Sequence, residues 1–227
     1  MQNSVLPAAF ASIALSAGLA AASGSIVIDD FSTDLSAGPL GTFGLPTFSS
    51  DTAPLGALGD RTTTLTLNAS NPSPQSSTLG ILSAGGGLPN RLSFSNGSQQ
   101  ISNSFSITYD SLTQTDFAAS ISGPGFFEFE VASSDLDDRT TPVFLDASIS
   151  VNGVTRTVSV SGEGTYSIGF SDFGGVDFSN VTSVGFAFGT ESVDAVDISF
   201  ANLRATPAPS AAALLGIAGL ATTRRRR

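Results

Sequence analysis

Phe127-Glu128-Phe129-Glu130-Val131 is the stretch that decides the fold of this chain. Apolar and acidic side chains alternate along it with a period of two. This alternation places the two phenylalanines and the valine on one face of an extended strand and the two glutamates on the other. The same alternation recurs through the interior of the chain, and no interior segment has the 3.6-residue period of a helix. The chain is therefore predicted to be all-β.

Further predicted strands surround this stretch, each with the same period-two pattern. They comprise residues 25–31, 62–67, 92–95, 105–109, 143–151, 155–160, 166–170, 184–188 and 196–200. Asn152-Gly153, between two of them, predicts a two-residue hairpin because both residues tolerate a positive φ. About ten short strands with such turns are typical of an antiparallel sandwich or barrel. Residues 33–60 and 68–90 are rich in Gly, Pro, Ser and Thr, and we expect them to form long connections along one rim.

Phenylalanine is expected to supply the core of this sandwich. The chain has 17 phenylalanines and no tryptophan, and most of the phenylalanines occupy alternating strand positions. Phe126 is out of phase with Phe127 and is expected to face outward.

The C-terminal segment, residues 206–227, has three parts. Pro207, Ala208 and Pro209 are followed by an apolar stretch over residues 210–223, and the chain closes with Arg224, Arg225, Arg226 and Arg227. As a helix the apolar stretch would span about 21 Å, which is less than the roughly 30 Å hydrocarbon core of a bilayer. The arginines are expected to remain cytoplasmic. A segment that is cut is one interpretation, and an ordinary short membrane anchor is the alternative.

This architecture resembles the PEP-CTERM sorting signal, which is processed by exosortase-type membrane proteases and transpeptidases. That family usually has a glutamate between the two prolines, where this chain has Ala208. The resemblance implies an exosortase-type partner and transient anchoring in the inner membrane by the C-terminal segment. It also implies a final location at the cell surface or in the extracellular matrix.

The N-terminal segment is consistent with export. Residues 5–22 are apolar and end in Ala20-Ala21-Ala22, the small-residue pattern of a signal-peptide cleavage site. An amphipathic surface helix is the alternative, but the segment has no charged face. The predicted organisation is a signal peptide over residues 1–22, a β-sandwich domain over 23–205 and the sorting signal over 206–227.

Composition excludes several classes of function. The chain has no cysteine and no histidine, so Ser-His-Asp and Cys-His nucleophiles and zinc sites of the His/Cys type are absent. All nine basic residues are arginines and four of them close the chain, which leaves five against 19 acidic residues in the body. A nucleic-acid partner needs a basic footprint and is therefore excluded.

Carboxylates are the remaining acid-base candidates. Glu128 and Glu130 share one face of the predicted strand, with Cα atoms roughly 6.6 Å apart, a spacing from which two carboxyl groups can act on a glycosidic bond. The solvent face of a half-buried strand explains the same pattern without catalysis. We therefore expect no enzymatic activity, and no cofactor is implied.

The opening residues 26–32 and the closing residues 196–204 resemble the first and last strands of galactose-binding-like jelly-roll domains. Gly59-Asp60-Arg61 and residues 107–110 fit the same pattern loosely. The resemblance implies an antiparallel jelly-roll-type β-sandwich, in which a structural calcium commonly lies between the first and last strands. Asp29, Asp30, Asp194 and Asp197 are the candidate ligands, since calcium prefers oxygen donors. Asp135, Asp137 and Asp138 form a second acidic cluster, and solvated acids in turns explain both clusters adequately.

Three functional hypotheses remain. The first is an exported surface or extracellular-matrix protein without catalytic activity, and it is the preferred one. The second is a carbohydrate-binding module of the envelope or matrix, with polysaccharide as its partner. The third is a glycan-cleaving enzyme that uses Glu128 and Glu130.

Overall fold

The computed structural model describes residues 24–35, 40–43, 47–55, 59–67, 76–83, 89–97, 102–112, 115–121, 124–190, 193 and 195–208. The expected signal peptide over 1–22, and Pro209 with the apolar stretch and the arginines, lie outside these residues. No helix in the described part of the chain is long and apolar enough to cross a membrane.

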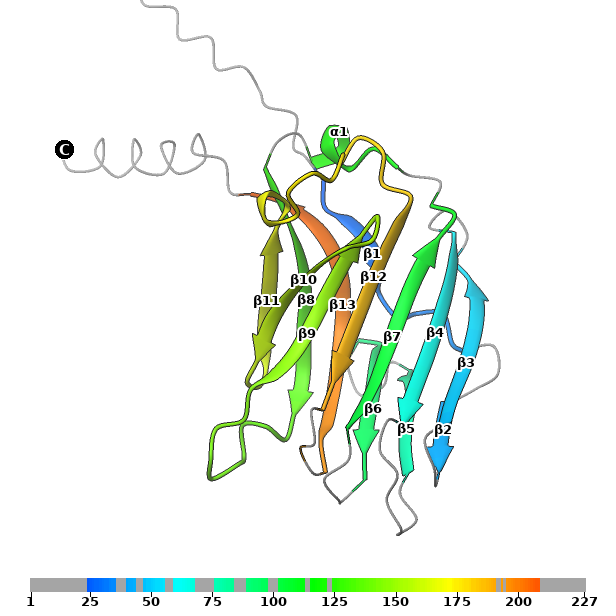
Figure 1. Cartoon of the computed structure of the whole chain (residues 1–227), viewed down its shortest axis with the longest axis vertical. Coiled ribbons are helices and arrows are strands. Elements are labelled where there is room, and N and C mark those ends of the chain that lie inside the picture. The colour runs from blue at the N-terminus through cyan, green and yellow to red at the C-terminus, as the bar shows by residue number, and fades with distance from the viewer. Residues whose placement is uncertain are drawn as a thin grey trace, which may run out of the picture.

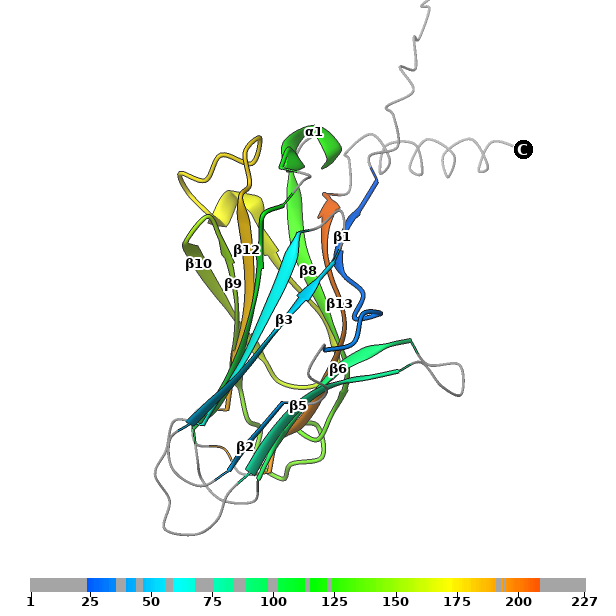
Figure 2. The same ribbon diagram turned by 90° about the vertical axis from the view of Figure 1, so that its right-hand side faces the viewer.

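Two antiparallel sheets face each other and form a jelly-roll-type β-sandwich, as predicted (Figures 1 and 2). Sheet A has the order β11 (Gly164–Gly169), β8 (Gly125–Ser134), β13 (Asp197–Pro207), β6 (Arg91–Asn96), β5 (Ser76–Leu82) and β2 (Leu40–Phe43), with β1 (Ile26–Asp29) also paired to β13. Sheet B has the order β10 (Val154–Val160), β9 (Leu145–Val151), β12 (Ser183–Gly189), β7 (Asn103–Asp110), β4 (Asp60–Leu67) and β3 (Thr47–Pro54). A short helix, α1 (Phe117–Ile121), lies at one end of the sandwich, and η2 (Phe170–Asp172) follows β11.

The prediction that residues 33–60 and 68–90 are only connections is wrong. They contain β2, β3 and β5, and β2 and β3 are the edge strands of their sheets. The inward positions of β3 are occupied by Asp51 and Ala53, and one inward position of β5 is Ser77. Because Asp51 and Ser77 are polar and Ala53 carries only a methyl group, these strands lack the clear hydrophobic alternation by which strands are recognised from sequence.

The predicted hairpin at Asn152-Gly153 is confirmed. These two residues join β9 to β10, and their φ angles are 49° and 83°. Positive φ at both central residues gives the turn a twist that matches the two strands it connects.

The core between the sheets is built from phenylalanine. Phe200 of sheet A packs against Phe105, Phe186 and Phe188 of sheet B, with ring centroids 5.6, 5.2 and 5.4 Å away. A second group of rings lies toward the end that carries α1 and comprises Phe117, Phe127, Phe170, Phe173 and Phe178. Phe126 is half-buried while its neighbour Phe127 is buried, so the expected outward position of Phe126 is confirmed.

A buried polar network stabilises the crossing from sheet A to sheet B between β6 and β7. Asn103 donates from its side-chain amide to Ser77 Oγ and Asn96 Oδ1, and its backbone N–H donates to Thr190 Oγ1 at 3.0 Å. Asn96 Nδ2 donates to the same threonine hydroxyl at 3.3 Å. These hydrogen bonds hold the ends of the two strands in one arrangement, although the side-chain oxygen of Asn103 is buried without a partner among the described residues.

Candidate functional site

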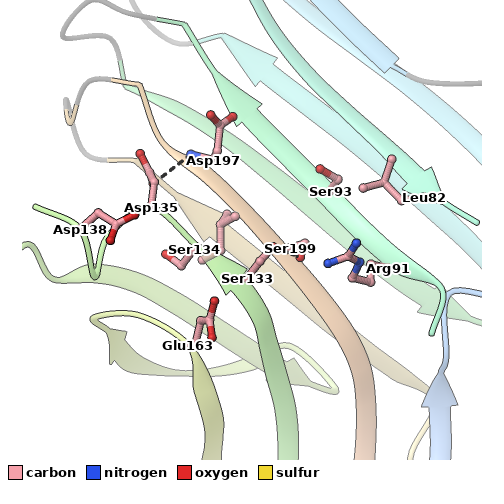
Figure 3. Close-up of a pocket in the computed structure, with 11 residues that line it drawn as sticks. Leu82, Arg91, Ser93, Ser133, Ser134, Asp135, Asp138, Glu163, Asp197 and Ser199 are labelled. Carbon is pink, nitrogen blue, oxygen red and sulfur yellow. Dashed lines mark hydrogen bonds between the residues drawn. The ribbon is translucent and has the colours of Figure 1, made fainter. Parts of the chain in front are cut away.

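A polar groove of about 290 Å³ opens on the outer face of sheet A (Figure 3). Strands β5, β6, β8 and β13 supply its floor and one wall, and the loops after β8 and before β11 supply the other wall. Its volume is slightly below that of a typical site for a drug-sized ligand, so it suits one small polar unit, such as one residue of a polymer.

The floor of the groove is a row of serines. Ser199 of β13 lies opposite Ser93 of β6 on one side and Ser133 of β8 on the other, because the register of the three strands aligns them. The hydroxyl oxygens of Ser133 and Ser199 are 2.6 Å apart and share a hydrogen bond. Each hydroxyl can both donate and accept, so the row can satisfy either kind of ligand group.

Carboxylates line one end of the groove. Asp135, Asp138, Glu163 and Asp197 gather there, on the side away from Arg91 (Figure 3). Asp135 is already engaged, since it pairs with Arg139 at 2.9 Å and accepts a hydrogen bond from the backbone N–H of Asp197 at 3.1 Å. The other three carboxylates have no salt-bridge partner among the residues that the structure describes.

Arg91 forms the opposite end, beside the exposed side chain of Leu82 (Figure 3). Within the described part of the chain, its Nε is buried and has no hydrogen-bond partner. The residue as a whole is half-buried, so part of its side chain is accessible from the groove. The groove therefore offers a strong donor at one end and strong acceptors at the other.

Glu128 and Glu130 lie on the outer face of β8, on one side of the strand as predicted, but they do not line this groove. Glu128 accepts a hydrogen bond from Arg204 Nε at 3.2 Å, and Glu130 accepts one from Asn202 Nδ2 at 2.8 Å. Both carboxylates are thus held by side chains of β13.

Asp29 lies in a buried cluster with Arg61 and Tyr109, remote from the groove. Its Oδ2 accepts hydrogen bonds from Arg61 Nη1 at 3.0 Å and from the Tyr109 hydroxyl at 2.9 Å, and its Oδ1 accepts one from the Phe31 N–H at 2.7 Å. Arg61 Nη2 also donates to the carbonyl oxygens of Thr33 and Asp34 at 2.6 and 3.1 Å. A guanidinium that is 1% exposed is thus enclosed by a carboxylate and two carbonyls, the oxygen groups that bind calcium elsewhere.

The candidate calcium ligands are not brought together as a set. Asp29 lies opposite Leu203 of β13, whereas Asp197 begins that strand six residues earlier, roughly 20 Å away along it. Asp30 is exposed, and hydrogen bonds from the Ser32 hydroxyl and from the Ser32 N–H, the latter at 2.9 Å, lower the pKa of its carboxyl group. Asp194 lies outside the described residues. Among the described residues, no three Asp or Glu side chains form a group that could hold a metal ion.

Burial and the neighbouring charge of Asp29 raise the pKa of Tyr109 well above its usual value of 10. The folded state therefore keeps the phenol proton at a pH where the unfolded chain releases it. We expect the free energy of unfolding to fall by about 1.4 kcal/mol per pH unit as the pH rises above about 10. Urea unfolding of the wild type and of Tyr109→Phe at pH 9, 10 and 11 measures this slope. The variant should lack this contribution, and equal slopes in the two proteins would contradict the assignment.

Sequence reasoning identified Asp135 and Asp138 only as an acidic cluster and did not identify Arg91 or the serine row. Arg91 and Ser93 alternate with Leu92 and Phe94 in a predicted strand, so the alternation already indicated that they point outward. Their proximity to Ser133 and Ser199 depends on the pairing of β13 with both β6 and β8, which local sequence does not specify.

No protein-family model matches the chain, and no curated protein matches it. Among solved structures, it is similar to a family 11 carbohydrate-binding module from Clostridium thermocellum in complex with a β-1,3-1,4-mixed-linked tetrasaccharide, with 16% identity and a TM-score of 0.43 over 83% of this chain and 98% of that one. It is similar to a carbohydrate-binding module of family 28, specific for non-crystalline cellulose, with 18% identity and a TM-score of 0.36 over 57% and 82% of the two chains. It is also similar to an exo-β-agarase, with 10% identity and a TM-score of 0.41 over 82% of this chain and 25% of that one. These identities and TM-scores do not assign the chain to any of those families.

Proposed function

We propose that this protein is a glycan-binding module without catalytic activity. The observation that carries this proposal is the groove of Figure 3, in which a serine floor separates the guanidinium of Arg91 from three carboxylates. A saccharide presents hydroxyls that donate and accept within one ring, and the two ends of the groove match those two roles. The exposed Leu82 offers an apolar contact for the C–H face of a sugar ring.

The charge of the groove restricts the glycan. Three carboxylates without salt-bridge partners face one guanidinium, so uronic-acid polymers would be repelled, whereas neutral and amine-bearing glycans would not. Two of the solved structures similar to this chain are carbohydrate-binding modules, and neutral glucans are therefore sensible first probes.

Native gel electrophoresis in gels that contain a soluble polysaccharide tests the proposal. We expect a neutral or amine-bearing glycan to retard the protein and polygalacturonate to leave its mobility unchanged. Asp138→Asn/Asp197→Asn should weaken the binding about tenfold, the effect of losing a charge-assisted hydrogen bond.

Asp60→Asn/Asp110→Asn is the matched control. It removes the same charge from two exposed residues that lie opposite each other in sheet B, and it should bind as the wild type does. An absence of retardation in every glycan, or an equal loss in both double variants, would refute the groove as the site.

We also propose that the module is exported and sorted through its C-terminal segment. Pro207 is the last residue of β13, and the Ala208 N–H donates to the Pro124 carbonyl at 2.7 Å, so the sandwich continues directly into the expected Pro207-Ala208-Pro209 motif. Intact mass spectrometry of the protein from its own host tests this. A chain that starts near Ser23, ends between Pro207 and Ser210 and lacks the arginines supports the proposal. A chain that still ends at Arg227 excludes processing and favours a short membrane anchor.

A further inference from the structure

The outer face of sheet B carries an ordered array of hydroxyl groups, on the opposite side of the sandwich from the groove. Two rows of side chains cross all six strands in register. One row is Thr52, Thr62, Thr108, Gly185, Ser150 and Thr155, in the order β3, β4, β7, β12, β9 and β10. The other row is Ser50, Thr64, Ser106, Ala187, Ser148 and Thr157. Every member is Ser or Thr except the two in β12.

This array, which we call the hydroxyl face, is regular because strand geometry makes it so. Neighbouring strands lie about 4.8 Å apart and alternate residues of a strand about 6.8 Å apart, which sets the spacing within and between the rows. Cross-strand contacts support the pattern, since Ser50 lies 3.3 Å from Thr64 and Thr52 lies 3.4 Å from Thr62, oxygen to oxygen.

A furrow of about 140 Å³ runs along the middle of the hydroxyl face. Its floor is β12, where Ala187 has only a methyl group and Gly185 has no side chain, although the Ser150 hydroxyl leans over Gly185. Its walls are hydroxyls of β7 and β9, and Thr155 of β10 also lines it. Figure 1 shows β12 between these two strands. Because the small residues and the walls both follow the strand direction, the furrow fits a linear ligand laid along β12.

Charge is excluded from the two rows although the body of the protein is strongly acidic. The exposed acids of this face lie at its ends: Asp60 and Asp110 oppose each other at one end, and Asp146 is at the other. The exposed ring of Phe144 precedes β9 next to that second end. An occupant therefore meets hydroxyls and no charge along the furrow, which disfavours an ionic polymer and favours a neutral, polyhydroxylated one.

We propose that the hydroxyl face binds a linear neutral polysaccharide along β12, as a second binding surface besides the groove. The two surfaces belong to different sheets and face opposite directions, so one molecule can hold two polymer chains at once and join them. This inference does not depend on the groove, because no residue is shared between the two surfaces.

Charge placed in the furrow tests the inference. Ala187→Glu puts a side chain and a negative charge on the furrow floor, and Ser106→Ala/Ser148→Ala removes two wall hydroxyls with almost no change in shape. We expect each change, made in the Asp138→Asn/Asp197→Asn background in which the groove is weakened, to raise the dissociation constant for a soluble neutral β-glucan or xylan by about tenfold or more, measured by affinity electrophoresis. Ala118→Glu makes the same substitution at an exposed position of α1, which lines neither surface, and should bind as the wild type does. Thermal unfolding confirms that each variant is folded.

Other results of these experiments would distinguish the hydroxyl face from the groove and from self-association. If Asp138→Asn/Asp197→Asn alone abolishes binding of neutral glycans while Ala187→Glu binds normally, the second surface is overturned and the groove stands. If the wild type binds no neutral polysaccharide, the hydroxyl face is not a glycan surface. If sedimentation shows a dimer that Ala187→Glu disperses, a second copy of this chain occupies the face and the inference is overturned. Clumping of a neutral polysaccharide by the wild type, but not by either surface variant, supports the joining of two chains.

Discussion

Replacing Arg61 with methionine should lower the free energy of unfolding by about 3–5 kcal/mol at pH 7. Arg61 and Asp29 are 1% and 2% exposed and pair at 3.0 Å, so removing the guanidinium leaves a carboxylate inside the sandwich without its counter-charge. The carbonyls of Thr33 and Asp34 lose their donor at the same time. Urea denaturation of wild type and variant measures the difference.

The dependence of this loss on pH identifies its cause. Burial raises the pKa of the Asp29 carboxyl group even beside Arg61, and without the guanidinium it rises further. A raised folded-state pKa gives stability that is present at low pH and lost as the pH rises above the value of the unfolded chain, about 3.9. The penalty of Arg61→Met should therefore be smaller at pH 4 than at pH 7.

A neutral partner provides the control. Asp29→Asn/Arg61→Met removes both charges and keeps an oxygen that can accept from Tyr109, so it should recover about 2 kcal/mol or more of the loss. If the double variant is no more stable than Arg61→Met at pH 7, the ion pair is not the origin of the effect.

Phe200→Ala should have a comparable effect, a loss of about 3–5 kcal/mol. Phe200 is fully buried, and its ring contacts rings of both sheets: Phe129 in sheet A and Phe105, Phe186 and Phe188 in sheet B. Truncation leaves a cavity at the point where the sheets are joined, and these rigid neighbouring rings cannot easily collapse into it.

Phe144→Ala is the matched control for this truncation, because the same side chain is removed where it is 66% exposed. Its free energy of unfolding should stay within about 0.5 kcal/mol of the wild type. Chemical denaturation of both variants makes the comparison. A small loss in Phe200→Ala would mean that the sheets repack, and the described ring cluster would then not be the main contact between them.

The local sequence pattern predicted those parts of the fold in which the inward positions of a strand are apolar. Phe127, Phe129 and Val131 alternate in sequence and are buried together, and Asn152-Gly153 forms the expected turn. The β3 and β5 strands were missed because Asp51 and Ser77 take inward positions that such reasoning reserves for apolar residues. Arg61 is a third polar residue of this kind, in phase with Leu65 and Leu67, and such a residue is itself a signal of a buried ion pair.

The functional surfaces were less accessible because they depend on register. The sequence itself shows Thr62-x-Thr64 and Ser148-x-Ser150, and this spacing indicates that outward positions of β4 and β9 carry hydroxyl groups. Nothing local says that these positions align across six strands, or that Gly185 and Ala187 lie between them. The partner of Asp29 was hidden for a similar reason. Arg61 lies 32 positions away in the sequence, so the sequence did not show that a guanidinium, and not calcium, would neutralise the Asp29 carboxylate.

The position of β13 has a mechanical consequence for a domain held by its C-terminus. This strand pairs with β8 along one side and with β6 and then β1 along the other. Tension that enters at Ala208 runs lengthwise along β13, perpendicular to its hydrogen bonds, so these rungs are loaded together and not opened one after another. The N-terminal strand is attached differently, because β1 has four residues and pairs, among the described strands, with β13 alone, so a pull on its N-terminal end would peel it away. If the domain is anchored at its C-terminus and binds polymer on its faces, a force on the polymer is thus transmitted along β13, which is hydrogen-bonded on both sides.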